Sequence, residues 1–133
     1  MIALVGSGEY LPAILPVDRT LLERLPGSPN VICLPTAAGT EGAERIKYWS
    51  DLGIQHFSSL GVPVESLPVT DRLSANDADI IAPIQRANFV YLSGGKPDYL
   101  LKTLADSVAW QAIQAMLARG GLLAGGMRAG SGP

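Results

Sequence analysis

Four short apolar runs in this chain each lead into a loop of glycine or other small residues. An unbroken apolar run of about four residues is typical of a strand that is buried on both faces of a parallel sheet. In open α/β sheets ligands bind at the carboxyl ends of the strands, where glycine lets backbone N–H groups approach a ligand or a developing oxyanion. The pattern therefore predicts both the fold and the place of the site. The runs are residues 2–5, 30–34, 88–92 and 122–124, and the loops after them are residues 6–11, 36–42, 93–98 and 125 onward.

Helical patterns separate these runs. A weaker run at residues 62–67, which contains Pro63 and ends before Pro68, predicts a third strand at an edge of the sheet. Residues 74–77 resemble a capping box that begins the next helix, and Pro83 predicts that this helix is kinked or split in two. The alternation predicts a single domain over residues 1–133, with a three-layer α/β fold, a mostly parallel sheet, helices on both faces and right-handed crossovers. The expected helices are residues 16–25, about 15 residues after the 36–42 loop, one that Pro97 begins, and residues 107–119.

Composition excludes several classes of function. The net charge is −2 and no basic block is present, which argues against a nucleic-acid partner. The single cysteine, Cys33, rules out an internal disulfide and fits a reducing compartment. No signal-peptide pattern is present, and no apolar run approaches the roughly 20 residues of a membrane span. We therefore expect a cytoplasmic protein with no membrane partner.

No cofactor or metal is expected. The Gly6-Ser7-Gly8 sequence begins like a dinucleotide fingerprint, but Leu11 stands where the third glycine belongs, and no acidic residue follows the second strand. The Gly94-Gly95-Lys96 sequence lacks the first glycine and the hydroxyl residue of a phosphate-binding loop. No His, Cys, Asp or Glu cluster has metal-ligand spacing.

The isolated reactive side chains are interpreted as structural. His56, the only histidine, lies on a helix that flanks the sheet away from the loops, so we expect a partly exposed residue rather than a catalytic base. Cys33, Trp49 and Trp110 are expected in the core.

With these residues in view, the chain resembles the aspartyl dipeptidase and cyanophycinase family of serine peptidases, within the class I glutamine amidotransferase-like (flavodoxin-like) fold. It is most similar to uncharacterised bacterial type 1 glutamine amidotransferase-like proteins. The resemblance implies a Ser-His-acid peptidase or amidase, whose serine lies on an elbow after the last strand and whose oxyanion donor comes from the Gly94-Gly95 turn. The motifs that carry it are Leu4-Val5-Gly6-Ser7-Gly8-Glu9, Cys33-Leu34-Pro35-Thr36-Ala37-Ala38, Tyr91-Leu92-Ser93-Gly94-Gly95 and Gly121-Leu122-Leu123-Ala124-Gly125.

The chain departs from the family at the elbow. The family sequence is Ala-Gly-Cys/Thr-Ser-Ala-Gly-Ala, whereas this chain has Ala124-Gly125-Gly126-Met127-Arg128-Ala129-Gly130-Ser131. Met127 or Arg128 takes the serine position, and neither side chain can attack a carbonyl; Ser131 comes a few residues later. The family histidine and acid follow the elbow. We therefore expect the amino-terminal part, or a degenerate member, of a family that hydrolyses small peptide or amide bonds, truncated at its carboxyl end and inactive as written.

Two other interpretations remain open. One is a non-catalytic module that binds a small ligand, such as an anion or a nucleotide, with the same glycine loops. The other is a subunit that a second chain completes. An elbow strand without its following helix leaves a sheet face uncovered, so we also expect self-association through that face. The residues expected to line the pocket are Gly8, Glu9, Thr36, Ser93, Lys96 and Asp98, beside the elbow residues Gly125 and Gly126.

Overall fold

The computed structural model describes residues 2–5 and 15–126 of the 133-residue chain. Its five strands form one sheet in the order β1-β5-β4-β2-β3, and every neighbouring pair is parallel. The predicted α/β fold is therefore confirmed. The strands are β1 (Ile2–Val5), β2 (Val31–Leu34), β3 (Val64–Ser66), β4 (Phe89–Leu92) and β5 (Leu122–Gly126). The helices are α1 (Leu15–Glu23), α2 (Ala43–Ser59), α3 (Arg72–Ala75), α4 (Ala78–Ile81), α5 (Pro97–Leu104) and α6 (Val108–Ala118), with 3-10 turns η2 (Thr36–Ala38) and η3 (Ala82–Arg86).

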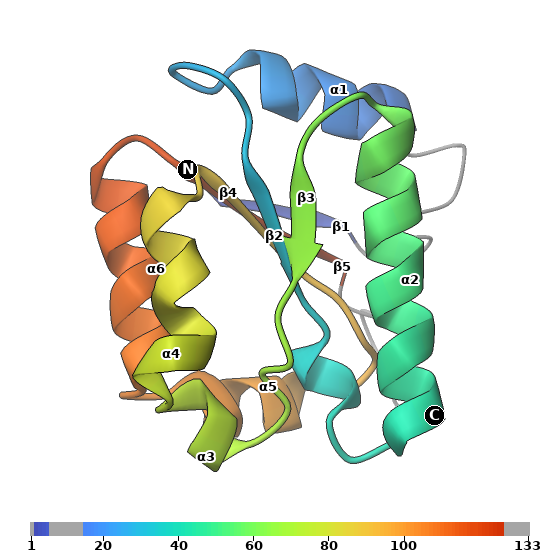
Figure 1. Cartoon of the computed structure of the whole chain (residues 1–133), viewed down its shortest axis with the longest axis vertical. Coiled ribbons are helices and arrows are strands. Elements are labelled where there is room, and N and C mark those ends of the chain that lie inside the picture. The colour runs from blue at the N-terminus through green and yellow to red at the C-terminus, as the bar shows by residue number, and fades with distance from the viewer. Residues whose placement is uncertain (1, 6–14, 127–133) are drawn as a thin grey trace.

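Helices cover both faces of the sheet, as the sequence predicts. Figure 1 shows the strands between α2 on one side and α4 with α6 on the other. The connections from β1 to β2 and from β2 to β3 run toward the β3 edge, and the connections through α3–α6 run back. All parallel crossovers are expected to be right-handed, so connections that run in opposite directions along the sheet lie on opposite faces. The order of the strands therefore explains why α1 and α2 lie on one face and α3–α6 on the other.

The side chains of the strands alternate between two hydrophobic clusters. Phe89 and Tyr91 of β4 face α1 and α2, where they pack with Phe57. Val90, between them, faces the opposite cluster with Ile113 and the other residues of α4–α6. Both faces of the central strands are therefore buried, which explains why their sequences are unbroken apolar runs.

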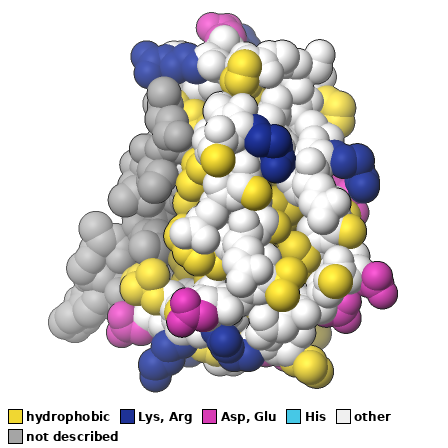
Figure 2. Space-filling model, turned by 90° about the vertical axis from the view of Figure 1, so that its left-hand side faces the viewer, with side chains coloured by type: hydrophobic (Ala, Val, Ile, Leu, Met, Phe, Trp, Pro, Cys, Tyr) yellow, Lys and Arg dark blue, Asp and Glu magenta, His cyan; other side chains and the backbone are white. Residues whose placement is uncertain are grey.

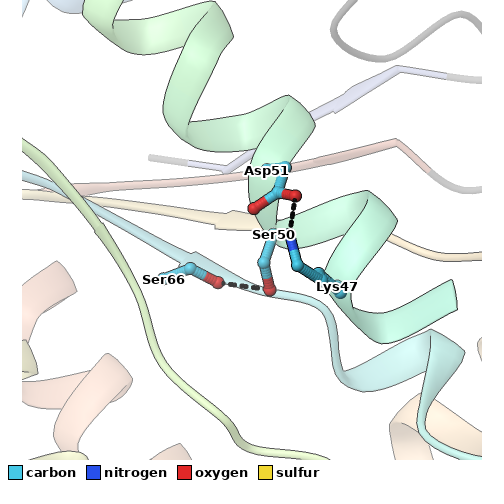
Figure 3. A network of polar contacts seen from close by, with 4 residues as sticks. All are labelled: Lys47, Ser50, Asp51 and Ser66. Carbon is cyan, nitrogen blue, oxygen red and sulfur yellow. Dashed lines mark hydrogen bonds and ion pairs between the residues drawn. The ribbon is translucent and has the colours of Figure 1, made fainter. Parts of the chain in front are cut away.

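The third strand lies at the edge of the sheet, as its two flanking prolines predict. It is shorter than the predicted run, because only Val64–Ser66 pairs with β2. The Ser66 hydroxyl donates to Oγ of Ser50 on α2, at 2.9 Å, so a side-chain hydrogen bond joins the edge strand to its covering helix (Figure 3). The ion pair of Lys47 with Asp51, also drawn there, lies within α2.

Two local predictions need correction. Ser74 does not begin the helix that carries Ile80 and Ile81. Instead it is the third residue of α3 and closes a capping box with the N-cap Asp71, while Asp77 caps α4. The split that Pro83 predicts is present, as α4 followed by η3. The other correction concerns where two strands start. The sequence predicts that they begin at Asn30 and Asn88, but β2 and β4 each begin one residue later.

The core predictions were confirmed for Cys33, which is 1% exposed, and in part for the tryptophans. Trp49 and Trp110 are partly buried, each against one of the two clusters. In the part of the chain that the structure describes, no helix has the length and hydropathy of a membrane span.

Candidate active site

The carboxyl ends of four strands lie next to one another in the sheet. In the register of the ladders, Val5 pairs with Gly126, and Leu92 pairs with both Gly125 and Leu34. The carboxyl ends of β1, β5, β4 and β2 therefore lie side by side along one edge of the sheet. This is the edge at which the sequence places the site, and β5, the strand before the expected elbow, lies between β1 and β4.

Two hydroxyl residues at this edge are fully buried. Thr36 begins η2 one residue after β2 ends, with Pro35 between them. Ser93 follows β4, and its N–H donates to the Leu34 carbonyl at 3.1 Å. Thr36 is 0% exposed and Ser93 is 1% exposed. Among the described residues, neither the Thr36 Oγ1 nor the Ser93 Oγ has a hydrogen-bond partner. Because a buried hydroxyl is normally paired, these two atoms are available to a ligand or a bound water.

The Gly94-Gly95 turn is built around Gly94. Its φ of +113° lies in the left-handed region, and a Cβ there would lie 2.6 Å from Ala38 N and 2.8 Å from the Ala37 carbonyl carbon. Gly94 is therefore fixed against η2 in a conformation that only glycine accepts without strain. Gly95 differs, since a Cβ would meet only the Glu41 Oε2, at 3.8 Å. Within the described part of the chain, neither glycine N–H donates a hydrogen bond, so both remain free to act as donors.

The start of α5 contributes a polar cavity of about 620 Å³ beside this turn. Pro97 is the first residue of α5, as the sequence predicts, and the predicted pocket residues Lys96 and Asp98 both line the cavity. The Lys96 Nζ donates to Thr40 Oγ1 at 3.0 Å, which joins the loops after β4 and β2. The structure thus brings together Thr36, Ser93, Gly94, Gly95, Lys96 and Asp98 at one edge.

Sequence reasoning missed four residues of this region. Thr40 lines the cavity, and Glu41 lies beside Gly95, with its carboxylate 3.7 Å from the Arg45 Nε. Both belong to the 36–42 loop, of which the sequence analysis singled out Thr36 but not these two polar side chains. Tyr99 and Lys102 line the cavity from the first turns of α5. The spacing of Asp98 and Lys102, four residues apart on one helix, was the available signal.

The elbow lies only partly within the described residues. Gly125 and Gly126 end β5, and a Cβ on Gly125 would lie 3.3 Å from the Leu92 carbonyl oxygen, so this strand end packs closely against β4. The predicted site residues Gly8, Glu9, Met127, Arg128 and Ser131 lie outside the described residues.

The only histidine lies far from this edge. His56 is near the end of α2, where its Nε2 is 2.5 Å from the Asp18 Oδ2 on α1. Figure 1 shows α1 at the end of the molecule opposite to α3 and α5. The prediction that His56 is partly exposed was wrong, since the residue is 6% exposed, and the reason is that α1 packs over it. Among residues 2–5 and 15–126, no group of three or more His, Cys, Asp or Glu side chains could hold a metal ion.

The chain is similar to known peptidases in sequence and in structure. The family model of peptidase family S51 matches residues 2–132. A crystal structure of a peptidase from an acI-B1 Actinobacterium is similar, with 39% identity and a TM-score of 0.87 over 93% of this chain and 52% of that chain. The structure of a putative peptidase E protein from Listeria monocytogenes EGD-e is 26% identical, with a TM-score of 0.68 over 96% of this chain and 58% of that chain. No curated protein matches. The chain thus spans between half and three fifths of these solved chains.

Proposed function

Because the chain belongs to peptidase family S51, we propose that it carries the oxyanion-binding part of a site that hydrolyses small peptide or amide bonds. In acyl transfer the carbonyl oxygen becomes negatively charged in the tetrahedral intermediate, and fixed N–H donors stabilise that charge. Each such donor lowers the barrier by about 3 kcal/mol. The N–H groups of Gly94 and Gly95, on a turn held rigidly against η2, are the donors in this proposal.

The further part of the proposal is that this chain does not hydrolyse the bond by itself. The single observation that carries it is the position of His56. The sequence contains one histidine, and its ring is buried against Asp18 at the end of the molecule away from the glycine turn. A general base must come within hydrogen-bond reach of the proton it removes, directly or through one water. A serine at the elbow would therefore lack the histidine that activates it.

A serine-directed fluorophosphonate tests this second part. We expect no labelling of the purified chain, because the one histidine of the sequence is buried against Asp18, away from the glycine turn. The matched control is Ser131→Ala, which reveals any background reaction at other hydroxyl groups. Labelling that is present in the chain and lost in Ser131→Ala would overturn the proposed inactivity.

A nuclear magnetic resonance titration tests the oxyanion turn separately. With a panel of unmodified dipeptides as the probe, we expect the largest amide shifts at Gly94 and Gly95 and small shifts at Gly61, a glycine at the end of α2. Shifts confined to other regions, or no shifts with any dipeptide, would contradict a substrate-binding role for this turn.

The polar cavity at the start of α5 favours a second candidate function. Lys96 and Lys102 contribute two ammonium groups to it, together with the Thr40 hydroxyl and the Asp98 carboxylate. Such a cavity suits a small anionic ligand that binds without being cleaved. Thermal shift assays with phosphate, nucleotides and acidic amino acids distinguish this candidate, because a rise in melting temperature is expected only if one of them binds the folded state. No shift with any of them would remove it.

A further inference from the structure

The Gly94-Gly95 turn has an acidic neighbour, Glu41, to which the proposed oxyanion site assigns no role. A Cβ on Gly95 would meet only the Glu41 Oε2, at 3.8 Å, so this carboxylate oxygen lies beside the turn. Within the described part of the chain, the Oε2 accepts no hydrogen bond. The Glu41 side chain is 24% exposed, so a ligand at the turn can reach the open oxygen.

The other oxygen of Glu41 is held by the protein. The Glu41 Oε1 lies 3.7 Å from the Arg45 Nε on the first turn of α2. The Arg45 guanidinium in turn lies over two rings, with its Cζ 4.6 Å from the Tyr48 centroid and 5.6 Å from the Trp49 centroid. Stacking on two aromatic rings restrains the guanidinium, which restrains the carboxylate. Glu41 is therefore oriented with one oxygen toward Arg45 and the other toward the glycine turn.

A carboxylate at this place opposes the charge that an oxyanion site stabilises. The Gly94 and Gly95 N–H groups, as the proposed donors, favour negative charge on the carbonyl oxygen of a ligand, and a second negative charge nearby disfavours it. Arg45 compensates only in part, because its side chain is 48% exposed and solvent screens the ion pair. A cationic group on the ligand, next to its carbonyl, would remove this opposition and would bind the open oxygen of Glu41.

The chemical group that meets this requirement is a free α-amino group. Its nitrogen is bonded to the carbon next to the carbonyl, so one residue of a ligand can place its carbonyl oxygen at the turn and its ammonium group at the neighbouring carboxylate. We propose that Glu41 determines specificity, because its Oε2 accepts a hydrogen bond from the ammonium group of the ligand whose carbonyl Gly94 and Gly95 bind. A ligand with an acylated amino group is then bound less tightly. This proposal rests on the proposed oxyanion role of the turn.

The general charge of this end of the molecule does not explain such a preference. Figure 2 shows acidic and basic side chains together at the end where α3 and α5 lie in Figure 1. Two lysines and one aspartate line the polar cavity beside the turn, so the net charge of these side chains disfavours an ammonium group. A preference for a free amino group is therefore assigned to Glu41 and not to the surface as a whole.

Two ligands that differ only at the amino terminus test the proposal. They are alanylalanine amide and its N-acetyl derivative, and neither has a carboxylate that could pair with Lys96 or Lys102 of the cavity. Nuclear magnetic resonance titration at mildly acidic pH, where the amino terminus is protonated, gives both dissociation constants from the amide shifts of Gly94 and Gly95. We expect the free ligand to bind at least about tenfold more tightly than the acetylated ligand, because a charge-assisted hydrogen bond is lost on acetylation.

Three variants assign this difference to one carboxylate. Glu41→Gln removes the charge at constant shape and should bring the ratio of the two dissociation constants close to one. Glu44→Gln is the matched control, because it removes one negative charge from an exposed residue in the first turn of α2 that does not contact Gly95, and it should keep the ratio. Glu41→Asp keeps the charge on a shorter side chain and should retain part of the ratio. Glu41 lies outside both hydrophobic clusters, so its variants should fold.

The two proposals fail in different ways. Equal dissociation constants for the two ligands in the parent chain, or a ratio that survives in Glu41→Gln, would overturn the role of Glu41 and leave the oxyanion turn in place. A Glu41 that served only to pair with Arg45 would give this result, because its removal would change the affinity for both ligands alike. The absence of shifts at Gly94 and Gly95 with either ligand would contradict the oxyanion turn and the role of Glu41 together.

Discussion

The imidazole Nε2 of His56 lies 2.5 Å from the Oδ2 of Asp18, and both side chains are buried where α1 packs against α2. The other carboxyl oxygen of Asp18, Oδ1, has no hydrogen-bond partner among the described residues. Among the described residues, the His56 ring is therefore the one side-chain partner of this fully buried carboxyl group. Because α1 lies at the end of the molecule opposite to α5, this pair is a structural contact between two helices rather than part of the candidate site.

Removing the ring should therefore destabilise the fold strongly. For His56→Ala we expect the free energy of unfolding to fall by about 3 kcal/mol, because a buried Asp18 carboxyl loses its partner. The measurement is urea denaturation, with the exposed neighbour Gln55→Ala as the control, which should cost little. In the Asp18→Ala and His56→Ala double variant the loss should be smaller than the sum of the two single losses. Strict additivity would show that the two side chains are not coupled.

The burial of His56 illustrates what the sequence could not predict. The position of the residue on a helix and its distance from the loops followed from the alternation of strands and helices. Its partner, however, is 38 residues away on α1, and nothing in the local pattern of α2 indicates that Asp18 would be buried with it. Apolar runs and glycine loops are local signals, whereas polar pairs between helices depend on packing.

The two glycines of the Gly94-Gly95 turn should differ sharply in their tolerance to alanine. Gly94→Ala forces a side chain into the left-handed region and against the η2 backbone, and we expect it to cost about 2–3 kcal/mol of stability. Gly95→Ala meets nothing closer than 3.8 Å and should cost less than about 0.5 kcal/mol. Chemical denaturation of both variants measures the difference. Equal losses would contradict the packing of Gly94 on η2.

The place of the candidate site in the fold was predictable to the level of loops. Glycine and small residues after each apolar run located the carboxyl edge, and the structure places Thr36, Ser93 and Lys96 there. The unpaired hydroxyl groups of Thr36 and Ser93 and the contact of Gly94 with η2 depend on the register of β2 and β4, which no single segment encodes. The predicted starts of these two strands were each one residue too early. At both positions the asparagine side chain bonds neighbouring backbone, while the Asn88 N–H still donates to the Asn30 carbonyl at 3.1 Å.

The Asn88 side chain is expected to stabilise the fold through its two hydrogen bonds at the start of β2 and β4. Its Oδ1 accepts from the Asn30 N–H at 2.8 Å, and its Nδ2 donates to the Ser28 carbonyl at 2.9 Å. Asn88→Ala removes both bonds and should cost about 1–3 kcal/mol, at the usual net value of about 1 kcal/mol for each bond. Thermal unfolding compares it with Gln114→Ala, an exposed amide on α6. A melting temperature equal to that of the Gln114 variant would show that solvent replaces both bonds without cost.

The capping box at the start of α3 should make Asp71 unusually acidic. The Ser74 N–H donates to the Asp71 Oδ1 at 2.8 Å, and the Ser74 hydroxyl donates to the same oxygen at 2.8 Å. These two bonds, the backbone bond first, hold the pKa of the Asp71 carboxyl below its ordinary value. A depressed pKa means that the stabilisation is complete above the pKa of the unfolded chain and is lost as the pH falls through the pKa of the folded chain.

Ser74→Ala separates the two contributions to this pKa. It removes the hydroxyl donor but keeps the backbone N–H, so the pKa of Asp71 should rise only part of the way to its ordinary value. The measurement is the pH titration of the Asp71 carboxyl carbon by nuclear magnetic resonance, with Ser58→Ala, an exposed serine on α2, as the control that leaves the pKa unchanged. The stability difference between the Ser74 variant and the parent chain should be present near neutral pH and should shrink in acid, because protonation of Asp71 removes the negative charge that strengthens the hydrogen bond from the Ser74 hydroxyl. A difference that stays constant down to acid pH would show that the serine acts through its bonds to the Thr70 and Asp71 N–H groups instead.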